Sequence, residues 1–339
     1  MAATLADVAA RAGVSSATVS RVLNGNYPVA ERTRERVLAA VTELHYVVNA
    51  HARALAASRS DVIGVVVNDI SDPYFGTMAD AVQGEAAAAD LLALICSTAG
   101  SPEEELRYVR LLLRQRVRSI VLTGGRREDP GYLAELTALL RQAADGDTDV
   151  VLCGRPPLPG THAVALQFDD RYGVAELTRH LLDAGHRRVA CIEGPERNST
   201  AAARLAGYRE AMGGLATRVL PGGFDRESGY RAARALLAEP AGERPTAIVA
   251  ANDLAALGVL AAARESGVRV PQDLSVAGYD DIPFAADAYP ALTTVYVPLT
   301  EAGTRAGRLA TARDPRPPSG EILLRPRLVP RDSVAPPLL

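Results

Sequence analysis

The sequence predicts an all-α N-terminal helix-turn-helix head followed by a two-lobed α/β core made of two doubly wound, parallel-sheet subdomains. Two observations predict this organisation. Residues 4–24 place apolar residues at helical spacing on both sides of a glycine, and from Asp61 onward apolar runs of strand length alternate with helical runs. We therefore expect a head over 1–46, a hinge segment over 47–60 and a core over 61–339.

The head begins with two short predicted helices. Thr4 is a suitable N-cap with Asp7 three residues on, and Gly13 supplies the left-handed residue that ends the first helix. Ser15 caps the second helix, whose valines pack back on the first, as a helix-turn-helix requires. The outward face of the second helix suits the major groove of DNA, although an ordinary helical hairpin in a core is the alternative. That face consists of Ser16, Ala17, Ser20 and Arg21.

A third helix and an alanine-rich segment complete the N-terminal region. The third helix is expected over residues 31–44, with an apolar stripe that packs under the first two helices and arginines on the side of solvent or phosphate. Asn49 is a plausible N-cap of the segment 47–60, which is too short for a stable isolated helix in water. We interpret it as a hinge that becomes helical on docking, with Leu55 as a wedge into a minor groove. A flexible linker in which Leu55 has no role is the alternative. The stripe is Val37, Leu38, Val41 and Leu44, opposite Arg32, Arg34 and Arg36.

Composition limits the protein class. The 339 residues are 48% hydrophobic and 23% charged, no apolar run approaches the roughly 20 residues of a membrane span, and residues 1–30 show no signal-peptide pattern. We therefore expect a cytoplasmic protein without a membrane partner. Residues 1–60 carry seven Arg against four acids, a charge of +3 on a chain whose net charge is −3, which indicates an anionic partner for the head. The odd number of cysteines argues against disulfides, so we expect reduced core residues at Cys96, Cys153 and Cys191.

The core reads as strands alternating with crossover helices. We expect the first lobe over about 61–161 and 291–320, and the second over about 162–290 and 321–333. The segment 292–297 should be a strand that crosses back to the first lobe. The expected strands are 62–67, 91–96, 119–122, 150–153, 164–168, 189–192, 247–250 and 274–277, and the clearest helices are 103–114, 172–184 and 253–266.

Polar or small residues follow nearly every predicted strand, where ligands bind in open α/β sheets. Converging carboxylates, amides and a guanidinium suit the vicinal hydroxyls of a sugar or nucleoside, and aromatic residues supply walls. Each polar residue alone could equally be a helix N-cap. No nucleotide-binding, phosphate-binding, nucleophile-elbow or metal-ligand motif is present, so we expect no catalytic residues, no metal, no cofactor and no enzyme activity. A solute-binding protein without DNA function and an α/β enzyme are the competing classes.

Motifs across the whole chain resemble the LacI/GalR family of bacterial transcription regulators. They include the run from Thr4 to Asn24, the segment from Asp69 to Phe75, Ala251-Asn-Asp253, Gly278-Tyr-Asp-Asp281 and Arg331-Asp-Ser333. The resemblance implies a periplasmic-binding-protein-like core and a homodimer on a pseudo-palindromic double-stranded DNA operator. It also implies a regulator that responds to a small sugar or nucleoside-like effector, most simply a repressor that the effector releases. A co-repressor, which promotes DNA binding, is the variant that the sequence leaves open.

The resemblance also implies site residues. Ser16, Ala17 and Arg21 match base-reading positions, Leu55 matches the minor-groove wedge, and Val297 and Gly154 stand where glutamine and aspartate are frequent. The DNA-binding set is Thr4, Ser15, Ser16, Ala17, Thr18, Ser20, Arg21, Asn24, Asn49, Arg53 and Leu55. The effector-binding set is Asp69, Tyr74, Phe75, Arg204, Phe224, Asn252 and Asp280.

Overall fold

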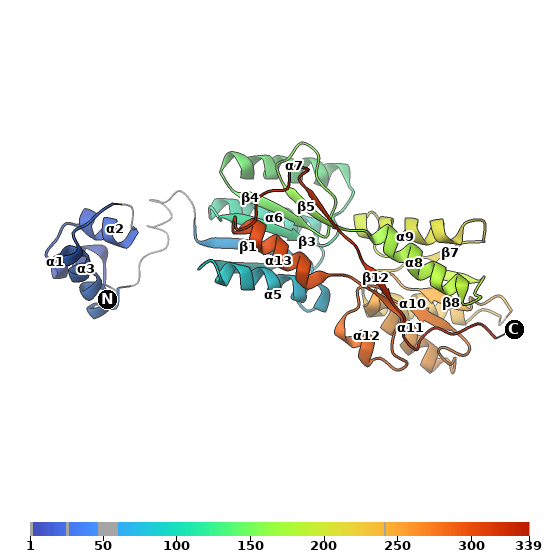
Figure 1. The fold of residues 1–339 in the computed structure, drawn as a ribbon. Coiled ribbons are helices and arrows are strands. Elements are labelled where there is room, and N and C mark those ends of the chain that lie inside the picture. Colours follow the sequence, from blue (N-terminus) through green and yellow to red (C-terminus); the bar gives the residue numbers. More distant parts are fainter. Residues whose placement is uncertain (1–2, 25–26, 47–59, 241, 339) are drawn as a thin grey trace. The chain divides into compact units, whose positions relative to one another are not determined.

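The computed structural model describes residues 3–24, 27–46, 60–240 and 242–338 (Figure 1). It divides into two compact units, residues 1–61 and 62–339. The expected hinge residues Asn49, Arg53 and Leu55 lie outside the described residues.

The head contains the three predicted helices, and its first turn forms the predicted capping box. The Thr4 hydroxyl accepts the Asp7 N–H at 3.3 Å, while the Asp7 carboxylate accepts the Thr4 N–H at 2.8 Å. Gly13 has a φ of 65°, which only glycine adopts without strain, so the chain can turn into the second helix. Ser15 caps that helix by accepting the Thr18 N–H at 3.2 Å. The helices are α1 (Leu5–Ala12), α2 (Ser16–Asn24) and α3 (Glu31–Glu43).

One expectation for α3 is wrong. Leu38 is 44% exposed instead of packed under the first helices, because Val37 and Ala40 supply the buried side of α3. Arg36 is exposed, as expected, and its guanidinium also donates to the carbonyl of Gly13 at 3.2 Å and to that of Ala12. It thereby satisfies carbonyls at the end of α1 that lack a helical partner.

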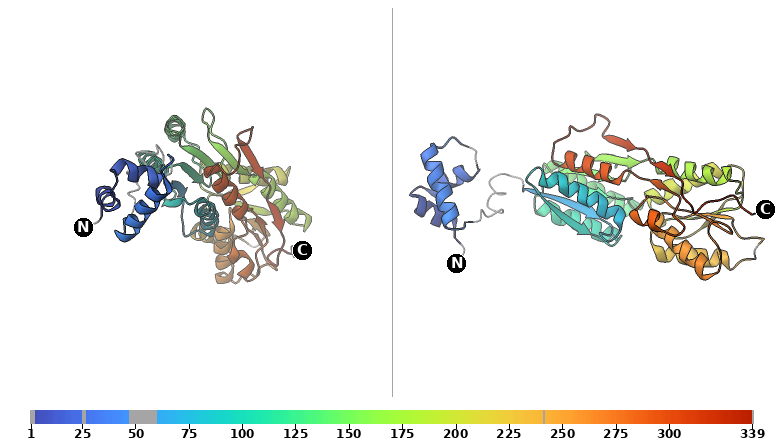
Figure 2. Two further views of the ribbon diagram at one scale, coloured as in Figure 1. Left: turned by 60° about the vertical axis from the view of Figure 1, so that its left-hand side comes forward. Right: turned by 60° about the horizontal axis from the view of Figure 1, so that its bottom comes forward.

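Lobe 1 is a parallel sheet covered by helices on both faces (Figures 1 and 2). Alternate residues of its central strands point to opposite faces, so Val65 and Val121 pack in one apolar core and Val66 and Leu122 in another. The strand order is β11-β5-β4-β3-β1-β2. The strands are β1 (Val62–Val67), β2 (Leu92–Ser97), β3 (Ser119–Thr123), β4 (Asp149–Cys153), β5 (Val164–Phe168) and β11 (Glu321–Leu324), with α5 (Pro73–Ala87) and α13 (Leu299–Ala310) on one face and α6 (Pro102–Arg114) and α7 (Pro130–Asp145) on the other.

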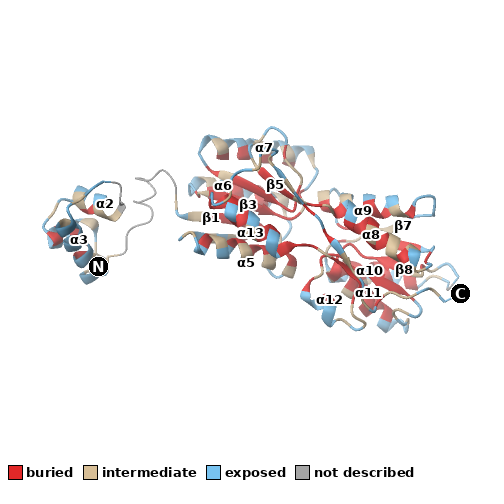
Figure 3. Ribbon diagram, viewed as in Figure 1, coloured by how far each residue is buried: buried red, intermediate tan, exposed pale blue. Residues whose placement is uncertain are grey.

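Lobe 2 repeats this plan around a shorter parallel sheet of order β7-β6-β8-β9. The strands β6, β8 and β9 are buried, whereas the edge strand β7 is of intermediate burial (Figure 3). The free cysteines Cys96, Cys153 and Cys191 are buried core residues, as predicted. The elements are β6 (Val189–Ile192), β7 (Arg218–Leu220), β8 (Ala247–Val249) and β9 (Ser275–Ala277), with α8 (Asp170–Asp183) and α9 (Ser199–Met212) on one face, α10 (Arg226–Leu237) and α11 (Asp253–Glu265) on the other, and a short α12 (Pro283–Asp287).

The expected boundaries of the lobes are wrong at two strands. β5 pairs with β4 and β11 pairs with β5, so both strands belong to lobe 1 although the sequence suggested lobe 2. Their position depends on pairing between segments about 150 residues apart, with Glu321 opposite Ala165, which no local pattern specifies. β10 (Thr294–Tyr296) and β12 (Arg327–Val329) form an antiparallel pair where the chain passes between the lobes.

The close packing of α8 against α9 depends on Gly207. A Cβ atom at this residue would lie 2.2 Å from the carbonyl oxygen of Arg171, which is backbone and cannot swing away. We predict that Gly207→Ala destabilises the core by about 1–3 kcal/mol, as overpacking typically does. Gly84→Ala is the matched control, because a Cβ on that helical residue of α5 meets nothing within 4 Å. Urea unfolding of both variants checks the prediction, and equal stability of the two would contradict it.

Candidate functional site

A cavity lies between the lobes, beyond the carboxyl ends of strands from both sheets. Six of the seven expected effector residues line it. The exception is Asp69, which is exposed and uses its carboxylate to accept the N–H and hydroxyl of Ser71 at 2.9 and 2.7 Å. The lining residues are Asn68, Asp72, Tyr74, Phe75, Gly124, Gly125, Asn198, Thr200, Arg204, Phe224, Asn252 and Asp280.

The Arg204 guanidinium is the hub of this cavity. Its Nε donates to Asp170 at 3.0 Å, its Nη2 to Asp280 at 2.8 Å, and its Nη1 to the carbonyl of Ala251 at 2.7 Å. The guanidinium also lies 3.9 Å from the centroid of the Tyr279 ring. These contacts hold together segments that follow β5, β8 and β9, so one side chain fixes the floor of the cavity in lobe 2.

The charges at this hub do not balance. One guanidinium faces two buried carboxylates. Burial raises the pKa of Asp280 well above its usual value, and the neighbouring Arg204 offsets this effect only in part. Burial alone would lower the pKa of Arg204, but the carboxylates of Asp280 and Asp170 outweigh that effect and keep the guanidinium charged. Asp280 also has a φ of 109°, a strained conformation for a residue with a side chain and one that clusters at functional sites.

Aromatic rings from both lobes face the cavity. Phe75 of lobe 1 packs edge-on against Tyr74 with ring centroids 4.9 Å apart, and Phe224 of lobe 2 lies 5.5 Å from the Arg204 guanidinium. Gly154 leaves room for this arrangement, because a Cβ there would lie 3.2 Å from the Tyr74 hydroxyl oxygen. Neither Gly154 nor Val297 is among the cavity-lining residues. The two positions at which the sequence departs from the family pattern therefore do not line the cavity directly.

Several polar groups of the cavity were missed as site residues. Asp72 and Asn198 are the N-caps of α5 and α9, and each spends one oxygen on a backbone N–H, of Tyr74 at 2.9 Å and of Ala201 at 3.1 Å. The remaining polar atom of each side chain is free to serve the cavity. The signal was present in the sequence, since both residues precede helices that follow strands, but a cap and a ligand-binding residue look alike there.

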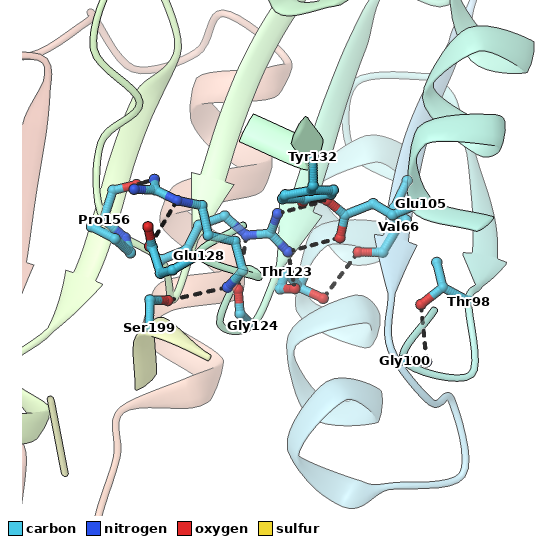
Figure 4. A network of polar contacts seen from close by, with 12 residues as sticks. Val66, Thr98, Gly100, Glu105, Thr123, Gly124, Glu128, Tyr132, Pro156 and Ser199 are labelled. Carbon is cyan, nitrogen blue, oxygen red and sulfur yellow. Dashed lines mark hydrogen bonds and ion pairs between the residues drawn. The ribbon is translucent and has the colours of Figure 1, made fainter. Parts of the chain in front are cut away.

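A second buried ion pair supports the cavity wall from inside lobe 1 (Figure 4). Arg155 binds Glu105 through both carboxylate oxygens, at 2.9 and 3.1 Å, and Tyr132 donates its hydroxyl to the same carboxylate. Arg155 also donates to the carbonyls of Gly124 at 2.8 Å and Thr123 at 2.7 Å. The segment from Thr123 to Gly125 is therefore fixed by a side chain that never reaches the cavity.

The second candidate site is the outward face of α2 in the head. Ser16, Ala17 and Arg21 are exposed, as predicted, whereas Ser15 and Thr18 share a hydrogen bond of 2.9 Å between their hydroxyls. The Arg21 guanidinium lies 5.4 Å from the centroid of the Tyr27 ring, a contact that leaves its donors available. Thr4 is exposed at the start of α1, and the side chain of Asn24 lies outside the described residues.

Two features of the described residues bear on other classes of protein. These residues contain no group of three or more His, Cys, Asp or Glu placed to hold a metal ion. No helix in this part of the chain is both long and apolar enough to cross a bilayer.

The protein combines a helix-turn-helix head with a two-lobed core that has a polar cavity between its lobes. This combination defines a class of regulators whose binding to DNA responds to a small ligand. Comparisons identify the family. Residues 4–49 match the model of bacterial regulatory proteins of the lacI family, and residues 178–334 match a periplasmic binding protein-like domain. The chain belongs to the lacI family and is a helix-turn-helix transcription regulator.

Relatives and solved structures match over nearly the whole chain. It is 35% identical over 345 residues to the HTH-type transcriptional regulator DegA of Bacillus subtilis (strain 168), covering 99% of both proteins. It is 35% identical over 341 residues to the HTH-type transcriptional repressor PurR of Escherichia coli (strain SMS-3-5 / SECEC), covering 98% of this chain and 97% of that one. The lac repressor dimer bound to operator and the anti-inducer ONPF superposes with a TM-score of 0.82 at 29% identity, over 99% of this chain and 100% of that one. A complex of the regulator CelR with cellobiose gives a TM-score of 0.69 at 32% identity, over 98% and 99%.

Asp253 makes stability depend on pH. Its carboxylate is buried and accepts the Ile282 N–H at 2.9 Å and the Thr294 hydroxyl at 2.6 Å, yet burial outweighs these bonds and raises its pKa from 3.8 to about 7. The folded state therefore binds a proton that the unfolded state has lost between pH 3.8 and 7. Stability contributed by the protonated carboxyl is lost as pH rises through that window, by up to about 4 kcal/mol.

We predict that Asp253→Asn removes most of this loss of stability between pH 5 and pH 8. The amide keeps an acceptor for Ile282 and can donate to Thr294. Asp273→Asn is the control, because hydrogen bonds from Arg269 lower the pKa of Asp273 to about 2 and it does not titrate in this range. Urea unfolding at the two pH values measures the effect, and an unchanged pH slope in Asp253→Asn would contradict it.

Proposed function

We propose that the protein is a cytoplasmic homodimeric repressor that binds a pseudo-palindromic double-stranded DNA operator and is released by a small sugar or nucleoside-like effector. The inter-lobe cavity carries this proposal, since it combines aromatic rings from both lobes with the charged hub of Arg204 and Asp280. The names of two similar proteins agree with it: PurR is called a repressor, and the lac repressor dimer is described on its operator.

The chemistry of the cavity favours a polyhydroxylated, uncharged effector. Carboxylate and amide groups of Asp72, Asn252 and Asp280 can each bind hydroxyls, and the rings of Phe75 and Phe224 offer apolar faces on which a sugar or base can stack. Arg204 is already neutralised by Asp170 and Asp280, so it offers little to an anion. A phosphorylated effector would also meet Asp72, whose desolvated carboxylate would repel it.

The proposed switch couples this cavity to the head through the dimer. Arg21 and its neighbours on α2 would read a half-site in the major groove, and Asn49, Arg53 and Leu55 would act in the minor groove between the half-sites. Effector binding would shift the first lobes across the dimer contact and separate the hinges. A change from 99% to 1% of the DNA-binding state requires about 5.5 kcal/mol of differential effector affinity. Neither a cofactor nor catalysis is part of this proposal.

Selection of DNA from a random library by the full-length protein tests the DNA function. We expect one short inverted repeat to be enriched without added ligand, and Arg21→Ala to weaken its binding by about 1–3 kcal/mol, the value of a bidentate base contact. Arg231→Ala is the control, since Arg231 is an exposed arginine on α10 of the core. Enrichment only after addition of cell extract would identify a co-repressor, and no enrichment in either case would refute the proposal.

Release of the selected operator by neutral monosaccharides and nucleosides tests the effector function. Phe224→Ala should leave operator affinity unchanged but raise the half-effective concentration of the releasing compound about fivefold, because a stacked ring contributes on the order of 1 kcal/mol. Tyr289→Ala is the control, since Tyr289 is 99% exposed and is not a cavity-lining residue. Equal sensitivity of the two variants would show that the effector does not bind against Phe224.

A further inference from the structure

Two loops from opposite lobes are hydrogen-bonded to each other beside the cavity. One follows β3 in lobe 1 and contains residues 126–128, and the other precedes and enters α9 in lobe 2 and contains residues 197–199. The Glu128 N–H donates to the carbonyl of Arg197 at 2.7 Å, and the Ser199 N–H donates to the carbonyl of Arg126 at 3.0 Å. The Arg126 N–H in turn donates to the Ser199 hydroxyl at 3.1 Å, a contact drawn in Figure 4.

This pairing, which we term the inter-lobe clasp, has the geometry of a small piece of antiparallel sheet. Arg127 and Asn198 are the bridge partners at its centre. The two backbone bonds flank this pair on either side, so Arg127 and Asn198 form a non-hydrogen-bonded pair, whose Cα atoms typically lie about 4.5 Å apart. Two lobes joined in this way cannot separate at this edge of the cleft without breaking the bonds.

The lobe 1 half of the clasp is held rigidly to its own lobe. The Arg126 side chain is buried and donates to the carbonyls of Pro156 at 2.7 Å and Pro157 at 3.0 Å, and its Nε lies 3.1 Å from the Glu128 carboxylate. The residues just before it are anchored by Arg155, as Figure 4 shows for the carbonyls of Thr123 and Gly124. The loop is therefore a preformed arm rather than a segment that must fold when the cleft closes.

The lobe 2 half is continuous with the effector hub. Asn198 caps α9, the helix that carries Arg204 one and a half turns further on, and both Asn198 and Thr200 line the cavity. Gly125 lets the halves meet, because a Cβ on it would lie 2.6 Å from Asn198 Oδ1 and 2.7 Å from Thr200 Oγ1. Asn198 Oδ1 is committed to the Ala201 N–H and cannot move aside freely.

We propose that the inter-lobe clasp holds the cleft closed before any effector binds, so that an effector enters only when the clasp opens. All three hydrogen bonds of the clasp join protein atoms of the two lobes, so none of them requires a ligand as a bridge. Effector uptake would then depend on the opening of the clasp, and residues 126–128 and 197–199 would set that rate without contacting DNA. The entry of an effector rests on the proposed function, whereas the closed state of the cleft does not.

A reversible cross-link tests the closed state. In the full-length variant Arg127→Cys/Asn198→Cys the expected Cα separation falls within the range that a disulfide spans. We expect mild oxidation of the effector-free protein to form this disulfide nearly completely, as judged by intact mass after blocking free thiols in denaturant. The single variant Arg127→Cys is the control for pairing with the buried native cysteines. A double variant that folds but does not cross-link would overturn the proposal.

Hydrogen exchange provides a test that does not depend on replacing the Asn198 cap. In the wild-type protein the amides of Glu128 and Ser199 should be protected without ligand, because both donate across the cleft. Gly125→Ala should accelerate their exchange at least tenfold, whereas Gly84→Ala should not change it. Rapid exchange of both amides in the wild-type protein, or no effect of Gly125→Ala, would contradict a closed clasp.

The gating step has its own readout. Oxidised Arg127→Cys/Asn198→Cys protein should keep its selected operator in a mixture of sugars and nucleosides that releases the reduced protein, and reductant should restore release. Equal release of both forms, or failure of the oxidised form alone to bind the operator, would overturn gating. Cross-linking and amide exchange involve no DNA, so they remain decisive even if the protein selects no operator.

Discussion

The geometry of the cleft depends on one buried guanidinium that binds two carboxylates. Arg204 draws the segments after β5, β8 and β9 together through Asp170, Ala251 and Asp280. A buried ion cluster of this kind is expensive to desolvate and contributes little net stability, but removal of one partner leaves buried charge at a cost of about 3–5 kcal/mol. Arg204 therefore specifies the shape of the site more than it stabilises the fold, and this shape is what an effector would recognise.

A second guanidinium acts in the same way on the other side of the cavity. Arg155 is fully buried and forms an ion pair with Glu105. Its guanidinium also donates hydrogen bonds to the carbonyls of Thr123 and Gly124. In each lobe, then, a buried arginine converts a loop at the end of a parallel strand into a fixed wall. Fixed walls matter because a ligand that must order its own site gives up part of its affinity to do so.

The sequence anticipated much of the site because parallel sheets place ligands at one edge. Asn252 and Asp280 were predicted from strand ends, Arg204 was predicted from the helix after Gly194, and the family resemblance supports all three. All three line the cavity. Asp69 follows β1 just as closely, but its carboxylate accepts a hydrogen bond from the Ser71 hydroxyl in a local turn. Asn198 and Thr200 were missed, since only the approach of the two lobes brings the start of α9 against Gly125. Local sequence patterns indicate which polar residues could line a cavity, but they do not indicate which of these residues lie close together in the folded chain.

The sequence by itself determined the head, the alternation of strands and helices, and the set of polar residues at strand ends. Each of these follows from contacts within a few residues, such as the capping box of Thr4 and Asp7 or the left-handed Gly13. The tertiary structure decided to which lobe β5 and β11 belong, which charges are buried together, and how the lobes are joined at the clasp. Those outcomes depend on pairing and burial between segments that are far apart in the sequence, by 34 residues for Arg204 and Asp170 and by 73 for Arg126 and Ser199. The energies of such contacts are set only once the whole chain has folded.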